Sequence, residues 1–193
     1  MERSVHEEER LLRFRSGCNA TTMTETPVGR QVQLPASVAG ALFLSEMPGS
    51  KKSLVDWLAG AEATQISLIV NLAQDEELAS ISPKYLGYIQ NNEGIEILCF
   101  PIPDFSVPAD MAAFHIFVGK VVERLHLGQR VVVHCRAGIG RSGLFAASLL
   151  TNLEMPSDDV LLSVQSAGGR LEADAQRSFV EAYGEHLTGG SSY

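Results

Sequence analysis

The 193-residue sequence has few cysteines, few basic residues and no long apolar run. Its three cysteines, at positions 18, 99 and 135, do not form the pattern of a disulfide framework, which favours a reducing, cytoplasmic setting. The longest apolar runs, such as 66–70, are far too short to span a bilayer. Residues 1–15 mix arginine with Glu7, Glu8 and Glu9 and lack the apolar stretch of a signal peptide. These absences argue against a membrane-spanning protein and against a small disulfide-linked secreted domain.

Basic residues are outnumbered by acidic ones. Fifteen lysines and arginines stand against 23 acidic residues, and the net charge of −8 argues against general binding to nucleic acids or anionic membranes. Residues 111–153 are the exception, with a local charge of +4 that comes from one acid, Glu123, and five basic residues: Lys120, Arg124, Arg130, Arg136 and Arg141. A charge run is usually a solvated face, but the motif described below favours a focused anion site in this segment.

Hydrophobic residues make up 45% of the chain, which is enough for a packed domain. Residues 1–40 are charge-dense and then rich in Thr, Ser, Gly and Pro, and we expect a loosely ordered or peripheral leader. From residue 41 onward, short apolar runs at 41–44, 66–72, 95–100 and 130–134 alternate with helical patterns at 54–59, 75–91, 109–127, 143–153, 157–166 and 173–187. This alternation predicts a single α/β domain over 41–187, with a mainly parallel central sheet flanked by helices on both faces, and a short tail at 188–193.

The strand predicted at 130–134 leads into a loop that combines a cysteine, two glycines and an arginine. Where a parallel strand ends, the next helix presents unpaired N–H groups and the positive end of its dipole, so an anion site is expected there. Arg141, six positions after Cys135, has a planar guanidinium that can hold two phosphate oxygens at once. We therefore expect phosphate to bind to the loop formed by Arg136, Ala137, Gly138, Ile139, Gly140 and Arg141.

Cys135 is the predicted nucleophile of this loop. A helix N-terminus and nearby cations lower the pKa of a thiol, about 8.5 when unperturbed, by several units, so Cys135 is expected to be a thiolate. A buried cysteine at a strand end is usually structural, but the Cys-x5-Arg spacing between a strand and a helix favours catalysis. His134 is expected to support the loop through hydrogen bonds. Ser142 is expected to donate to the sulfur as it leaves a phosphocysteine intermediate.

Asp104 is the predicted general acid that protonates the leaving oxygen. It lies in the proline-rich segment 100–108, directly after a predicted strand that should neighbour the strand carrying Cys135. The apolar neighbours Phe105 and Val107 can raise the pKa of its carboxyl group. An aspartate after a proline is more often a simple turn residue, and Asp110 is the fallback acid, although its position favours the first turn of the following helix.

Three other features carry weaker signals. Gln176, at the start of the last predicted helix, is a candidate for orienting the attacking water, although a solvated surface glutamine is at least as good an interpretation. Cys99 lies in a predicted strand and is expected in the core, with a protective disulfide to Cys135 as the minor alternative. The remaining candidate ligands, Cys18, His6, His115, His126 and His186, have no metal-ligand spacing, so no metal is implied.

The segment His134-Cys-Arg-Ala-Gly-Ile-Gly-Arg-Ser142 resembles the signature of the protein tyrosine and dual-specificity phosphatases. Segments 42–49, 70–72, 100–104 and 176–179 also occur in the right order for the compact dual-specificity enzymes, nearest to the cyclin-dependent-kinase-associated phosphatase type and its bacterial relatives. The resemblance implies hydrolysis of phosphomonoesters in phosphorylated proteins through a phosphocysteine, without metal or cofactor. It assigns Cys135 as nucleophile, Arg141 as phosphate clamp and Asp104 as general acid. Residues 1–40 lie outside the resemblance.

Several rival functions remain open at this stage. A lipid or small-molecule phosphatase would use the same chemistry, but Arg136 departs from the lysine-bearing loop of the inositol-lipid phosphatases. A catalytically silent phospho-binding module is disfavoured because Cys135, Arg141 and Asp104 are all present. Sulfur transfer and arsenate reduction also use a cysteine in an anion loop, but they fit the HCxxGxxRS pattern and the preceding acid poorly. The oligomeric state and the physiological substrate are not indicated.

Overall fold

In the computed structural model, which describes residues 25–91 and 94–189, the strands form one sheet. Their order across the sheet is β1-β2-β3-β6-β4-β5. β3, β6, β4 and β5 run parallel, whereas β1 and β2 are antiparallel additions next to β3. The predicted mainly parallel sheet is therefore confirmed. The bounds are β1 (Glu25–Thr26), β2 (Gly29–Val32), β3 (Ala41–Ser45), β4 (Leu68–Asn71), β5 (Glu96–Cys99) and β6 (Arg130–His134).

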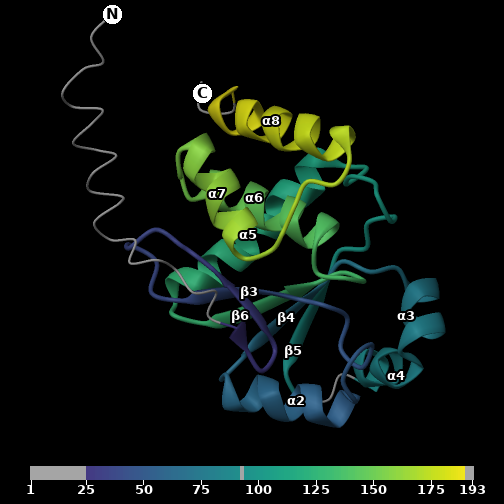
Figure 1. Cartoon of the computed structure of the whole chain (residues 1–193). Coiled ribbons are helices and arrows are strands. Elements are labelled where there is room, and N and C mark those ends of the chain that lie inside the picture. The colour runs from purple at the N-terminus through teal and green to yellow at the C-terminus, as the bar shows by residue number, and fades with distance from the viewer. Residues whose placement is uncertain (1–24, 92–93, 190–193) are drawn as a thin grey trace, which may run out of the picture.

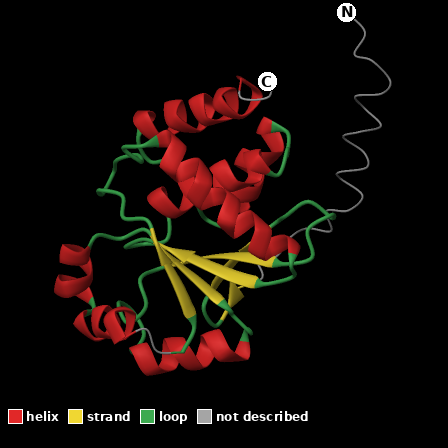
Figure 2. Cartoon of the chain, turned by 180° about the vertical axis from the view of Figure 1, so that it is seen from behind, coloured by secondary structure: helices red, strands yellow, loops and turns green. Residues whose placement is uncertain are grey.

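Helices cover both faces of the sheet, as predicted. α5 (Met111–His126), α6 (Gly140–Asn152), α7 (Ser157–Ser166) and α8 (Asp174–Gly189) lie on one side of the sheet (Figure 1). α2 (Leu54–Ala63) lies on the other side, with α3 (Asp75–Ile81) and α4 (Pro83–Asn91) near one edge, and the view from behind shows the same two layers (Figure 2). None of the helices in the described part of the chain is both long and apolar enough to cross a membrane.

The sheet separates two hydrophobic cores, and the residues of β6 contribute to both. Because side chains of a strand alternate between faces, Val131 and Val133 belong to the core under α5 and α6, and Val132 belongs to the core under α2. Trp57 of α2 anchors the second core and is 1% exposed. A strand buried on both faces needs this continuous apolar run, and the central position of β6 fixes Cys135 at the middle of one sheet edge.

The expectation of a peripheral leader is wrong for residues 25–40. β1 and β2 form a small hairpin in which β2 pairs with β3 from Arg30↔Leu44 to Val32↔Leu42. Val28 and Val32 are buried, one in each core. The two strands are too short for hydrophobic alternation to reveal them, since they span only 2 and 4 residues. The expectation for residues 1–24 lies outside the described residues.

The helix after the phosphate-binding loop begins earlier than predicted. We expected it from residue 143, whereas α6 begins at Gly140 and ends at Asn152. Arg141 therefore belongs to the first helical turn, where its backbone N–H has no partner within the helix. At the other end of the domain, α8 continues to Gly189, so it takes in the first residues of the predicted tail.

Candidate active site

The loop after β6 curls around the sulfur of Cys135. Gly138 adopts a φ of +71°, and a side chain there would collide with the backbone of Ser45. Its N–H donates to Cys135 Sγ at 3.3 Å. Cys135 itself is 3% exposed, so the thiol sits at the bottom of the loop rather than on the surface. The loop therefore holds the sulfur with a backbone hydrogen bond.

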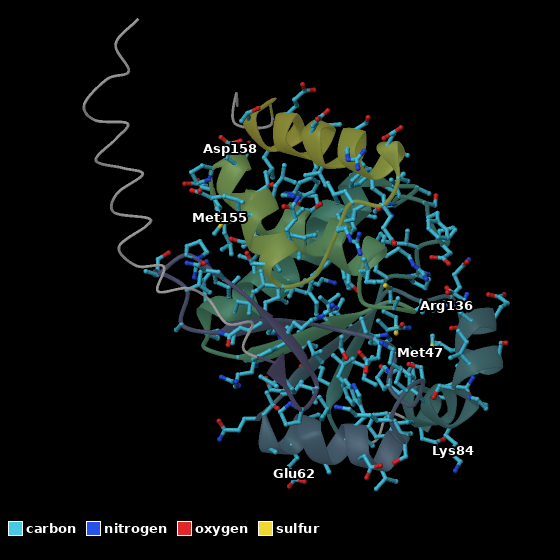
Figure 3. All side chains as sticks on the ribbon, viewed as in Figure 1. Met47, Glu62, Lys84, Arg136, Met155 and Asp158 are labelled. Atoms are coloured by element: carbon cyan, nitrogen blue, oxygen red, sulfur yellow. The ribbon has the colours of Figure 1, made fainter. Side chains whose placement is uncertain are left out.

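The loop carbonyls are turned outward by partners from three other segments. The carbonyl of Arg136 accepts from the Met47 N–H at 3.1 Å, and that of Ile139 accepts from the Arg170 N–H at 3.1 Å. Arg30 Nη2 donates to the Gly138 carbonyl at 2.7 Å. Figure 3 shows Arg136 and Met47 close together at the edge of the domain that also carries α3. With the carbonyls held outside, the loop N–H groups are free to line an anion site.

Arg141 is fully enclosed and already oriented. Its side chain is 1% exposed, and Nη1 and Nη2 donate to the two carboxylate oxygens of Glu77 at 2.6 and 2.8 Å. Nη1 also donates to the Ile102 carbonyl at 2.9 Å, and Nη2 lies 3.0 Å from Asp104 Oδ1. Its Nε has no hydrogen-bond partner among the described residues. A buried guanidinium N–H without a partner is costly, so this donor suits an incoming anion.

Glu77 is a candidate functional residue that sequence reasoning missed. It lies in the first turn of α3, where its carboxylate also accepts from the Gln74 N–H at 3.1 Å. The hydrogen bond from Arg141 lowers the pKa of Glu77, although burial opposes this shift. In the sequence, Asp75, Glu76 and Glu77 are typical of any helix start. Only the packing of α3 against the loop distinguishes Glu77 from its two neighbours.

The ring of His134 lies beneath the loop and contacts it on one side, where the sequence predicts a supporting hydrogen bond. Its Nδ1 lies 3.1 Å from the Cys135 carbonyl, and its Nε2 lies 2.8 Å from the hydroxyl of Tyr85. Both side chains are 0% exposed. Burial lowers the pKa of His134 to about 4, despite the opposing hydrogen bond with the Cys135 backbone. Tyr85, from α4, is a second partner that sequence reasoning missed.

This histidine makes stability depend on pH. His134 has a folded-state pKa of about 4, below the unfolded value of 6.5, so its contribution is complete above pH 6.5 and is lost as the pH falls towards 4. We expect the free energy of unfolding to fall by about 2 kcal/mol between pH 7 and pH 5, as measured by urea denaturation. An NMR titration of His134 with a midpoint near 6.5 would contradict this prediction.

The predicted acid lies beside the loop, and its fallback does not. Asp104 follows β5 and is 44% exposed, which leaves its carboxyl accessible to a leaving group above Arg141. Asp110 caps α5 instead, where its side chain accepts from the Ala113 N–H at 3.0 Å. Because the Asp110 side chain is engaged in capping α5, Asp104 is the better placed of the two to act as the general acid.

The weaker predictions have mixed outcomes. Ser142, seven positions after Cys135 in the sequence, is buried, but its hydroxyl has no hydrogen-bond partner among the described residues. Gln176 is 0% exposed, so the interpretation as a solvated surface glutamine is wrong. Cys99 is a free, exposed thiol at the end of β5, and its expected core position is wrong. Partial burial of the sulfur nevertheless raises the pKa of the Cys99 thiol.

A disulfide between Cys99 and Cys135 does not fit the register of the sheet. Asn71 of β4 pairs with Cys99 on one side and with His134 on the other. Cys99 and the residue before Cys135 are therefore two strand spacings apart, about 9–10 Å. A disulfide requires Cα atoms within about 7 Å, so this pair would need backbone movement.

The expected focus of positive charge is only partly correct. Arg124 pairs with Glu96 at 2.9 Å at the start of β5, and Arg130 Nε donates to the Thr64 carbonyl at 2.6 Å at the start of β6. Both lie at the sheet edge opposite Cys135, because parallel strands start and end at opposite edges. Arg136 and Arg141 alone, of the five basic residues between 111 and 153, belong to the loop.

A parallel α/β sheet with a cysteine and a buried arginine on one loop is typical of the tyrosine and dual-specificity phosphatases. A family model described as "Tc-R-P: Polymorphic toxin system, DSP-PTPase phosphatase" matches residues 45–153. The chain belongs to this family of phosphatases. The matched segment begins at the end of β3 and includes Asp104 and the whole Cys135 loop.

Individual relatives agree with this membership. Protein 197R of Invertebrate iridescent virus 6, named as a tyrosine phosphatase, is 40% identical over 65 residues, which are 32% of this chain and 24% of the viral protein. The chain thus matches about a quarter of that relative's length. Among solved structures, kinase-associated phosphatase with its catalytic cysteine replaced by serine has a TM-score of 0.73 at 20% identity, covering 88% of this chain and 98% of the other.

Two further solved structures share the fold at lower similarity. Tk-PTP in its active form has a TM-score of 0.61 at 24% identity, covering 78% of this chain and 97% of the other. PTPMT1 in complex with PI(5)P has a TM-score of 0.61 at 16% identity, covering 81% and 97%. At these identities the likeness shows a common fold, and the substrate has to be argued from the site itself.

Proposed function

We propose that the chain hydrolyses phosphomonoesters through a phosphocysteine, and that its substrates are proteins phosphorylated on tyrosine, with phosphoserine and phosphothreonine as further candidates. The observation that carries the proposal is that Cys135 and Arg141 lie on one loop, with Asp104 of a second loop 3.0 Å from Arg141. No cofactor is needed for this chemistry. A reducing, cytoplasmic setting suits a catalytic thiolate.

In the first step, the Cys135 thiolate attacks the phosphorus and the bond to the leaving oxygen breaks. The loop N–H groups of residues 136–141 and the free Nε of Arg141 stabilise the equatorial oxygens. Asp104 then gives its proton to the leaving oxygen, so the alcohol or phenol departs neutral.

In the second step, water attacks the phosphocysteine and the sulfur–phosphorus bond breaks. Asp104, now a carboxylate, takes a proton from that water. The unpartnered hydroxyl of Ser142 can turn towards Cys135 and donate to the departing thiolate. Inorganic phosphate leaves, and Cys135 and Asp104 return to the protonation states in which they began the cycle.

The apolar side chain next to the acid supports aryl phosphates as substrates. The Ser106 N–H donates to the Pro103 carbonyl at 3.0 Å, which closes a turn with Phe105 at its third position. Phe105 has a φ of +55°, where glycine is normally preferred, and its ring is 64% exposed. This strained turn holds an exposed phenylalanine next to Asp104 in the sequence, and the ring of a phosphotyrosine can pack against it.

A lipid or small-molecule phosphatase is the second candidate, because PTPMT1 shows that this fold can hold PI(5)P. The charge near the loop disfavours it here: Asp75 and Glu76 are exposed on the helix that carries Glu77. Exposed carboxylates repel polyanionic headgroups. A panel of phosphotyrosyl, phosphothreonyl and phosphoinositide substrates at several salt concentrations tests the proposal, and preference for the phosphoinositides would overturn the assignment of protein substrates.

Replacing the acid should affect poor leaving groups most. We expect Asp104→Asn to lower kcat/KM for phenyl phosphate by about 100-fold, and that for p-nitrophenyl phosphate much less, because nitrophenolate leaves without protonation. Asp110→Asn is the matched control and should keep normal kinetics. Equal losses for both esters in Asp104→Asn would move the acid elsewhere.

A further inference from the structure

Gln176 lies between the two loops of the candidate active site. It belongs to the first turn of α8, and its side chain is 0% exposed. Its Nε2 donates to the Ser106 carbonyl at 3.2 Å, and its Oε1 accepts from the Glu172 N–H at 2.8 Å. A buried amide with partners on two separate segments holds those segments at a fixed distance.

The first of these segments carries the acid. Ser106 closes the turn that contains Asp104, since its N–H donates to the Pro103 carbonyl. At the other end of the same loop, the Ile102 carbonyl accepts from Arg141 at 2.9 Å. The acid loop is therefore fixed on one side by the phosphate clamp and on the other side by Gln176.

The second segment supports the phosphate-binding loop. Its Arg170 N–H donates to the Ile139 carbonyl at 3.1 Å. The carboxylate of Glu172 lies against Gly140 in the first turn of α6. Through Glu172, Gln176 thus joins the acid loop to the segment on which the phosphate-binding loop rests.

From these contacts we infer that Gln176 is a positioning residue for general-acid catalysis, which holds Asp104 at its working distance from the phosphate-binding loop. This inference rests on the proposed function and assigns a role different from orienting the attacking water. Both ends of the Gln176 amide already have hydrogen-bond partners, and the side chain has no exposed surface. The amide is therefore placed to link the two segments, and we call this link the brace. Substitution of Gln176 should therefore make the loop that carries Asp104 more mobile, while the Asp104 carboxyl itself is retained.

The two roles predict different kinetics. kcat/KM reports only the steps up to formation of the phosphocysteine, whereas attack by water appears in kcat. We expect Gln176→Met to lower kcat/KM for phenyl phosphate by about 10- to 100-fold, and that for p-nitrophenyl phosphate by less than about 5-fold. Gln176→Glu keeps the acceptor for Glu172 but places a carboxylate oxygen against the Ser106 carbonyl, so it should show the same selective loss.

A second measurement follows the acid loop directly. Hydrogen exchange of residues 102–107 should become faster in Gln176→Met, while that of α2, on the far side of the sheet, stays unchanged. Gln165→Met, on the exposed surface of α7, is the matched control and should leave exchange and kinetics as in the wild type. Thermal unfolding of each variant establishes that it is folded.

The outcomes separate the inference from the proposed function. Unchanged kcat/KM for phenyl phosphate, with a lower kcat and a stoichiometric burst of phenol, would overturn the brace and favour water positioning. Equal loss of kcat/KM for both esters, or unchanged exchange at 102–107, would also overturn it. A folded wild-type protein that hydrolyses neither ester would overturn the proposed function itself.

Discussion

Cys135→Ser is expected to hydrolyse phosphotyrosyl peptides at least about 10⁴-fold more slowly than the wild type. The serine hydroxyl is much harder to ionise than the thiol, and the loop that stabilises a thiolate cannot compensate for this difference. The substitution is nearly isosteric, and the site is 3% exposed, so packing should change little. Steady-state and single-turnover assays on the same peptide measure the loss.

The chain offers a matched control for this substitution. Cys99 is a free thiol at the end of β5, exposed and two strands from His134. Cys99→Ser should keep wild-type turnover, because no step of the proposed mechanism uses this sulfur. Cys135→Ser should still bind inorganic phosphate, since the loop N–H groups and Arg141 are unchanged. Near-normal turnover by Cys135→Ser would remove the nucleophile assignment.

The Cys135→Ser variant can also be used to identify the substrate, because it should bind phosphorylated proteins without hydrolysing them. If Cys135→Ser retains phosphorylated proteins through the loop, we expect the exposed Phe105 and the carboxylates of α3 to determine which flanking groups are accepted. An exposed phenylalanine next to Asp104 in the sequence favours aryl esters, and carboxylates favour basic neighbours over polyanionic ones. In this proposal the residues of the Cys135 loop carry out the reaction, whereas residues on the surrounding elements select the substrate.

The parts of the fold that sequence predicts well are those with strong local signals. β6 at 130–134 and α7 at 157–166 match the predicted ranges, because an apolar run before glycines and a helical period bounded by a proline are visible without tertiary contacts. Pro83 divides the helical pattern at 75–91 into α3 and α4. The hairpin of β1 and β2 was missed because its strands are stabilised by pairing with β3 rather than by their own pattern.

The same division applies to the site. Cys135, Arg141 and the glycines occur within one short motif, so spacing alone predicts their proximity. Their supports come from elsewhere: Arg30 from β2, Glu77 from α3, Tyr85 from α4 and Gln176 from α8. Each of these contacts joins residues far apart in the sequence, and a single polar side chain at a helix start or strand carries no sign of its distant partner.

Arg141→Lys is the second substitution with a large expected effect. The guanidinium serves both oxygens of Glu77, the Ile102 carbonyl and Asp104, and it still has a free Nε for phosphate. A lysine ammonium has three donors on one atom and cannot replace this planar set. We expect kcat/KM for phosphotyrosyl peptides to fall by about 10³-fold, or about 4 kcal/mol of transition-state stabilisation.

Glu77 tests whether this loss comes from orientation as well as from phosphate contacts. We expect Glu77→Gln to lower kcat/KM by about 10-fold, because a neutral amide holds only one side of the guanidinium fork, and the double variant with Arg141→Lys to be little worse than Arg141→Lys alone. Glu76→Gln, exposed on the same turn of α3, is the matched control and should behave as the wild type. If Glu77→Gln behaves like Glu76→Gln, Glu77 only caps its helix; if the losses are additive, the two residues act independently, and the ion pair does not orient the phosphate clamp.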